Sequence, residues 1–92
     1  MKMHTRTWTV EVTITEDEDD RRTRAVAVLR TEARPQVRGE GVARRAPRDR
    51  EVPEIGDELA TARALADLAY QLLDVTAADI EAVVHRPVHL SG

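Results

Sequence analysis

The sequence predicts an α+β protein with one domain over residues 1–92, in which a three-stranded antiparallel meander is followed by one long helix packed on one face. The first half of the chain has three segments of alternating residues, separated by short polar turns. The second half has an unbroken helical spacing of apolar residues. A chain of 92 residues has room for one core only.

The first strand is predicted over about residues 5–15. Its apolar face is made of four residues: Trp8, Val10, Val12 and Ile14. Threonines and Glu11 occupy the other face, and this period of two is typical of a strand with one buried side. We therefore expect Trp8 to anchor the core or its edge. Residues 16–22 hold a run of acids and no apolar residue, which predicts a solvated turn.

Two further strands are predicted over about residues 23–31 and 37–44, with a turn containing Pro35 between them. The second strand should turn its small apolar residues to the helix: Ala25, Ala27 and Leu29. The third strand should do the same with another set: Val37, Gly39, Gly41 and Ala43. Glycine at every second position weakens a strand unless another backbone must come close, so we expect the helix to cross there.

The helix is predicted over about residues 55–84. Its apolar stripe follows spacings of three and four: Ile55, Leu59, Ala62, Ala66, Ala69, Leu73, Thr76, Ile80 and Val83. Three leucines widen the stripe: Leu65, Leu68 and Leu72. Acids in the first turn complement the helix dipole. A break near Val75 is the alternative, because Thr76 and Asp79 resemble a second N-cap. The tail, residues 85–92, stays unassigned.

Charge and composition restrict the function. Residues 1–50 carry twelve basic and nine acidic side chains, whereas residues 51–92 carry two basic and eight acidic ones. The chain has no cysteine, which excludes disulfides, thiolate metal sites and a cysteine nucleophile. The sequence shows neither a signal-peptide core nor an apolar run long enough to span a bilayer, so we expect a cytoplasmic protein that does not bind membranes.

Several segments resemble known families. RGEG at 38–41 and ALADLAYQLL at 64–73 are similar to the end of the double-stranded-RNA-binding domain (dsRBD). More closely, the chain resembles an actinobacterial family of small uncharacterised proteins described as dsRBD-fold-containing. The matching segments are TWTV at 7–10, RAVAVLRT at 24–31, VPEIGDELATARALADLAYQLLD at 52–74 and HRPVHL at 85–90.

The resemblance implies a dsRBD-like β-β-β-α fold in which the first helix of the domain is missing. It also implies a stress- or dormancy-type setting. We expect no cofactor. The features that bind RNA in that domain are absent or of the wrong sign here. Only four residues precede the first strand, the turn at 16–20 is acidic, and the helix opens with acids in place of lysines. Because phosphate neutralisation supplies most non-specific affinity, double-stranded RNA is a disfavoured partner.

The outward face of the sheet is the predicted partner-binding surface. It combines valines with a rim of arginines: Arg24, Val26, Val28, Arg30, Arg38, Val42 and Arg44. Apolar patches with arginine rims are typical of protein interfaces. The alternative is an ordinary open sheet face on which valine only supplies strand propensity.

Two other functions stay open. Nucleic acid could bind through the arginines of the sheet: Arg24, Arg30, Arg38, Arg44 and Arg45. No aromatic residue lies among them to stack a base, which argues against this function. His85 and His89 are spaced as in a zinc site, but Pro87 between them prevents a shared regular helix.

The sequence contains no catalytic constellation, since its only serine is Ser91 and no carboxylate lies in an apolar setting. We therefore predict a non-enzymatic protein that self-associates, with a dimer as the expected state, or that binds an unidentified protein partner. Nucleic acid is the first alternative, and metal binding by histidines is the second.

Overall fold

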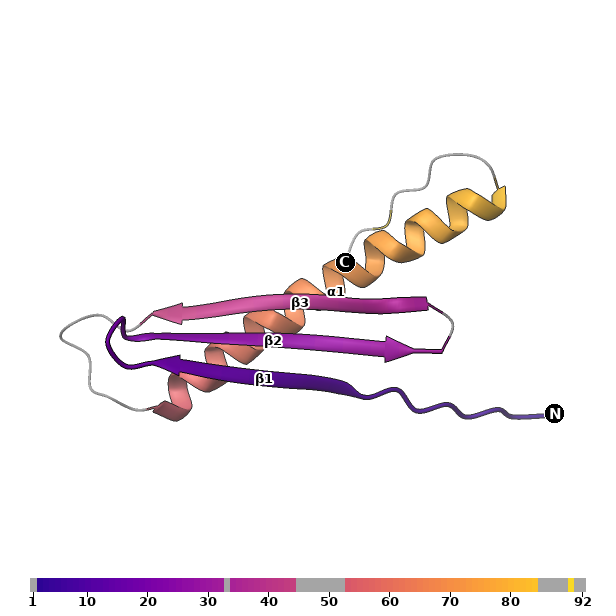
Figure 1. Cartoon of the computed structure of the whole chain (residues 1–92). Helices are drawn as coiled ribbons and strands as arrows, with labels where there is room; N and C mark the ends of the chain where they lie inside the picture. The colour runs from indigo at the N-terminus through magenta and orange to yellow at the C-terminus, as the bar shows by residue number, and fades with distance from the viewer. Residues whose placement is uncertain (1, 33, 45–52, 85–89, 91–92) are drawn as a thin grey trace.

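The computed structural model describes residues 2–32, 34–44, 53–84 and 90. The elements within them are β1 (Val10–Asp17), β2 (Arg22–Thr31), β3 (Arg34–Arg44) and α1 (Pro53–Val84). The three strands form one antiparallel sheet in the order β1-β2-β3, and α1 lies across one face of it (Figure 1). The predicted α+β class and β-β-β-α order are confirmed.

The first strand starts later and ends later than predicted. Val10 pairs with Leu29, and β2 ends at Thr31, so the register leaves residues before Trp8 with no strand beside them. Residues 2–9, called the N-terminal arm below, continue past the sheet in line with β1 (Figure 1). At its other end β1 reaches Asp17, inside the predicted turn. The prediction therefore placed the strand correctly but assigned it residues that lack a neighbour.

The β1–β2 connection is a tight acidic turn. The Asp20 N–H donates to Asp17 Oδ1 at 3.1 Å, and the Arg21 N–H donates to the Glu18 carbonyl at 3.4 Å. Arg21 adopts a φ of 51°, the left-handed conformation that lets the chain reverse. The run of acids at residues 16–20, called the acidic turn below, spans the end of β1 and this turn, at one end of the sheet.

The third strand begins at Arg34, earlier than the predicted residue 37, and thus includes Pro35. Proline lacks an N–H, and β3 accepts it because this strand lies at the edge of the sheet. The pairing with β2 is irregular between Leu29 and Thr31, next to this proline-containing end.

The helix is continuous from Pro53 to Val84, so the alternative break near Val75 does not occur. Proline suits a first helical position because its missing N–H has no partner there in any case. The Thr76 hydroxyl donates to the Leu72 carbonyl at 2.8 Å, so this side chain bonds back into the helix and caps no new one.

The core is built from small residues where the helix crosses β2 and β3. Its buried members are Ala25, Ala27, Leu29, Val37, Ala43, Ala60, Ala64 and Leu68. A Cβ on Gly39 would lie 2.5 Å from the Ala64 carbonyl oxygen, and one on Gly41 would lie 2.7 Å from the Cβ of Arg63. The prediction that these two glycines admit the helix backbone is therefore confirmed.

The predicted apolar stripe of the helix is wrong. Ile55 and Leu59 are exposed, as are the alanines at 62, 66 and 69. The buried line is instead the alanine-rich one that ends at Leu68, and Leu72 and Val75 extend it as partly buried residues. Apolar residues surround much of this helix, so spacing alone did not identify the packed face. The two glycines select it, because the helix backbone at Ala60, Ala64 and Leu68 lies directly against them.

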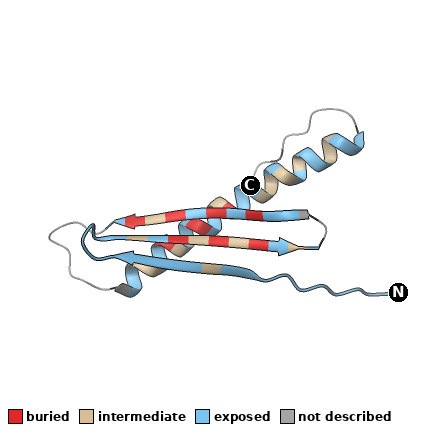
Figure 2. Ribbon diagram, in the orientation of Figure 1, coloured by how far each residue is buried: buried red, intermediate tan, exposed pale blue. Residues whose placement is uncertain are grey.

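The expectation that β1 contributes a buried face is also wrong for most of its residues. Trp8 is 58% exposed, Val10 37% and Ile14 41%, and only Val12 packs against the core. Burial is concentrated on β2, β3 and the middle of α1, whereas β1 is almost entirely exposed (Figure 2). A helix is about 10 Å wide and strands lie about 4.8 Å apart, so one helix covers about two strands.

Candidate functional site

The outward sheet face contains the predicted valines and arginines. The strand register sets Val28 between Glu11 and Arg38, and Val26 between Thr13 and Glu40. The three valines of this face are half-buried, whereas its arginines are exposed. The structure therefore brings most of the predicted set together on one surface.

The centre of this surface is an ion cluster. Arg24 Nη2 lies 2.7 Å from Glu40 Oε1, and Arg38 Nη2 lies 3.0 Å from the same oxygen. Hydrogen bonds from Arg24 and then Arg38 hold the pKa of the Glu40 carboxyl below its usual value. Arginine stems cover apolar surface while their guanidinium groups stay in water. The face is thus a polar layer over half-buried valines, and its two central arginines already bind a carboxylate.

The arginines proposed to bind nucleic acid are spread out. Arg44 pairs across the sheet with Arg22, at the start of β2, whereas Arg30 lies near the end of that strand. Eight strand residues span about 26 Å. Arg24 and Arg38 are occupied by Glu40, and Arg45 lies outside the described residues. The structure does not gather these five residues into one basic site.

The free edge of β3 is covered by side chains of the helix. The Glu40 N–H donates to Asp67 Oδ2 at 2.8 Å, and Arg63 Nη1 donates to the Val42 carbonyl at 2.7 Å (both backbone groups point away from β2). An edge strand whose backbone groups are bonded in this way is a poor template for another strand.

The opposite edge, that of β1, differs. Successive residues of an antiparallel strand direct their backbone groups to opposite sides. The Glu40 N–H points away from β2, so Glu40 and its partner Val26 form a non-hydrogen-bonded pair. The backbone groups of Val26 therefore bond to those of Thr13, its partner in β1. The neighbours of Thr13, namely Val12 and Ile14, therefore direct their N–H and C=O groups to the open edge.

Exposed apolar side chains lie next to this open edge. Val10 and Ile14 belong to the helix-facing side of the sheet, yet the helix leaves them exposed, and Trp8, which precedes β1 on the N-terminal arm, is exposed as well. On α1, Arg63 and Leu65 lie about 100° to either side of the buried Ala64. Because Arg63 bonds to the edge of β3, Leu65 lies on the side of the helix toward β1. We call Trp8, Val10, Ile14 and Leu65 the β1 flank. Sequence periodicity assigned its β1 residues to the core and therefore did not indicate this surface.

Acids meet at the end of the sheet where the helix begins. Glu16, the last helix-facing residue of β1, has its pKa raised by a hydrogen bond with the Asp57 side chain and by repulsion from that carboxylate. Repulsion from Glu18 and Glu54 adds to the effect. Among the described residues, no three histidine, cysteine or acidic side chains are placed to hold a metal ion.

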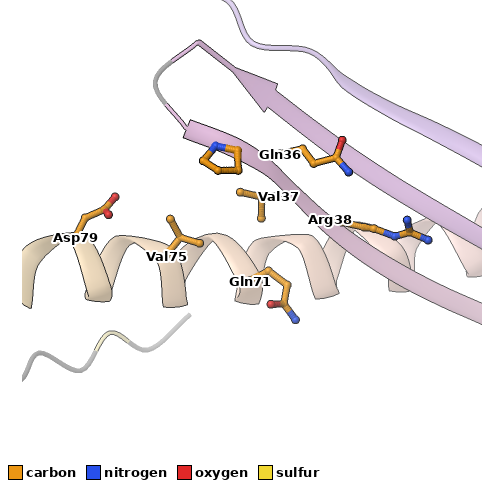
Figure 3. Close-up of a pocket in the computed structure, with 7 residues that line it drawn as sticks. Gln36, Val37, Arg38, Gln71, Val75 and Asp79 are labelled. Atoms are coloured by element: carbon orange, nitrogen blue, oxygen red, sulfur yellow. The ribbon is translucent and has the colours of Figure 1, made fainter.

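An open pocket of about 530 Å³ lies between the start of β3 and the C-terminal half of α1. Val37 and Val75 form its apolar part, while Gln36, Arg38 and Gln71 surround them (Figure 3). Its open shape and mixed lining define no reactive group.

The remaining predicted residues lie mostly outside this structure. His85 and His89 are not among the described residues, and His4 is exposed on the N-terminal arm. No helix in the described part of the chain is long and apolar enough to cross a membrane.

The fold defines a small α+β protein in which a single helix covers two strands of a three-stranded sheet and leaves most of the third strand exposed. The chain belongs to the Rv2632c-like family, which matches residues 6–89. The predicted membership of a family of small uncharacterised actinobacterial proteins is thereby confirmed, and the relation to the dsRBD stays a prediction.

Relatives are found in mycobacteria. The chain is 53% identical over 83 residues to uncharacterized protein Mb1767 of Mycobacterium bovis, covering 90% of this chain and 85% of that protein. It is 51% identical over 80 residues to uncharacterized protein Rv2632c of Mycobacterium tuberculosis, covering 87% and 85%. The crystal structure of Rv2632c superposes with a TM-score of 0.81 and 47% identity, over 95% of this chain and all of that one.

Proposed function

We propose that this protein acts by association, as a non-enzymatic module that forms a homodimer. The observation that carries the proposal is the bare strand edge of β1 beside the exposed apolar residues of the β1 flank. Exposed apolar side chains beside unpaired backbone groups are a typical place for a second chain to bind.

The small core supports the same proposal. The core is alanine-rich, and none of its large side chains is fully buried in the described part of the chain. A domain of this size buries only about 60% of its unfolded surface, so its stability is marginal. Association would add buried apolar area to each chain and stabilise it.

The outward sheet face supports association less well than the β1 flank. Its valines are half-buried already, and Glu40 binds the two central arginines. The same ion cluster weakens the case for nucleic acid, because arginines bound to a carboxylate must exchange that partner for phosphate.

Sedimentation velocity over a range from low to high micromolar protein tests the proposal. We expect a monomer–dimer equilibrium whose midpoint changes little with salt, because apolar burial is not screened. A strictly monomeric particle at the highest concentration would contradict it.

A parallel titration of labelled RNA, followed by fluorescence anisotropy at low and physiological salt, tests the alternative. We expect no binding at physiological salt. Submicromolar binding that survives physiological salt would favour the nucleic-acid function over association.

A further inference from the structure

We propose that the dimer forms by antiparallel pairing of β1 with β1 of a second copy, about a twofold axis at Val12. This inference rests on the proposed self-association and specifies its interface. The result would be one continuous six-stranded sheet with a helix near each end of the same face.

The backbone of β1 fits this pairing. Val12 and Ile14 direct their N–H and C=O groups outward, and Val10 shares their alternation. With the axis at Val12, that residue exchanges hydrogen bonds with the partner's Val12, and Val10 does so with the partner's Ile14. Every outward-directed group of this central segment then gains a partner.

Side-chain charge selects this register. With the axis at Val12, Glu11 lies opposite the partner's Thr13, so no like charges face each other within β1. Moving the axis to Glu11 would set two glutamates directly opposite, which is destabilising. Moving it to Thr13 would set Val10 against the partner's Glu16. Of the three axes, only the one at Val12 avoids both of these contacts; Val10, Val12 and Ile14 then pair among themselves, and Trp8 lies opposite the partner's Glu16.

The N-terminal arm and the acidic turn are complementary in the same register. The arm continues the line of β1 past the sheet (Figure 1) and carries three basic or titratable side chains: Lys2, His4 and Arg6. The acidic turn has five consecutive acids at the other end of β1. Antiparallel pairing brings each arm to the partner's turn, with Arg6 opposite the partner's Glu18. Opposite charges across a strand pair stabilise it.

The assembly closes at two copies. A twofold pairing of β1 leaves only the two β3 strands as edges, and Asp67 and Arg63 cover each of those. A sheet with covered outer edges gives a dimer and no fibre. The open edge of β1 is thus paired only with β1 of a second copy.

Cysteine cross-linking directly tests the β1–β1 pairing, called the β1 seam below, and its register, because the natural chain has no cysteine. The variants are Thr9→Cys, Thr13→Cys and Thr15→Cys, all at exposed positions on the outer side of the sheet. With the axis at Val12, residue 9 faces residue 15 of the partner as a non-hydrogen-bonded pair, with Cα atoms about 4.5 Å apart. That spacing permits a disulfide.

Mild oxidation of an equimolar mixture of Thr9→Cys and Thr15→Cys should give a covalent heterodimer. The mixture of Thr9→Cys with Thr13→Cys, and Thr13→Cys alone, should give none. Cross-linking of either control would overturn the register, since those pairs face each other only with the axis at Glu11 or at Thr13. All three variants keep Glu11, whose charge the argument uses.

Failure of the seam is distinguishable from failure of association. A dimer in sedimentation that no pair cross-links would overturn the β1 seam and leave the proposed function intact. A monomer in sedimentation would overturn both. Arg6→Glu adds an independent readout of the arm: it should weaken the dimer several-fold at low salt and have little effect at high salt. An equal loss at both salt concentrations would contradict the proposed contact with the acidic turn.

Discussion

The two edges of the sheet have opposite surroundings. At the β3 edge, Asp67 and Arg63 of the helix bind backbone groups that would otherwise be free. At the β1 edge no side chain of the described residues does so, and the apolar residues beside it are exposed. Both strands are edge strands of the same sheet, so their position relative to the helix makes the difference.

The comparison shows how two glycines decide which edge stays open. Gly39 and Gly41 let the helix backbone approach β3, and this approach carries Asp67 and Arg63 to the edge of that strand. One helix spans about two strands. Covering β3 therefore leaves β1 uncovered, and the open edge results from the same packing that protects the other one.

The largest expected effect comes from removing that close approach. Gly39→Ala would place a Cβ against backbone atoms of the helix, which cannot move aside as the end of a flexible side chain can. We expect a loss of about 3 kcal/mol or more in the free energy of unfolding, at the high end for overpacking. Urea denaturation measures it. Gly56→Ala is the control, because its nearest neighbour is the flexible Thr23 side chain at 3.0 Å. It should be neutral or stabilising, since alanine favours helix.

Removing the cover of the β3 edge should have the next largest effect. Asp67→Ala deletes the acceptor of the Glu40 N–H, a charged hydrogen bond that contributes about 1.5 kcal/mol. Asp74→Ala, at an exposed position of the same helix, should change the free energy of unfolding by less than about 0.5 kcal/mol. Equal losses in the two variants would show that the edge contact contributes nothing.

A charge at the β1 edge should weaken association and spare the fold. Val10→Lys places a cation on the β1 flank, and we expect the dimer dissociation constant to rise about tenfold, equivalent to about 1.4 kcal/mol. Val28→Lys introduces the same charge on the outward face of the sheet. Sedimentation velocity on both variants separates the two surfaces. Should Val28→Lys abolish the dimer while Val10→Lys does not, the outward face would be the interface.

The smallest expected effects concern two glutamates with opposite pKa changes. Hydrogen bonds from arginines lower the pKa of Glu40, so its stabilisation is present near neutral pH and is lost as pH falls through the folded-state pKa. Asp57 raises the pKa of Glu16, so the folded state is stabilised as pH falls through that raised value.

Thermal unfolding across pH checks both directions. Near neutral pH, Glu40→Gln should be less stable than the natural chain and Glu16→Gln more stable. Both differences should disappear in acid, where the natural carboxyls are protonated. Changes of the same sign in the two variants would contradict the assigned causes.

The sequence predicted the architecture better than the site. Alternation in the strands fixed which residues of β2 and β3 face the helix, and glycine spacing correctly located the crossing. The burial of Trp8, Val10 and Ile14 was mispredicted because alternation shows that a strand has two faces but not whether a helix reaches it. The helix stripe was mispredicted because alanine counts as apolar on every side.

The most direct test of the two-edge account is amide hydrogen exchange, followed residue by residue at low and high protein concentration. The Glu40 amide, bonded to Asp67, should be protected at both concentrations. The Val12 and Ile14 amides should exchange freely at low concentration and become protected as the dimer forms. Free exchange of both β1 amides at a concentration where sedimentation shows a dimer would contradict the account.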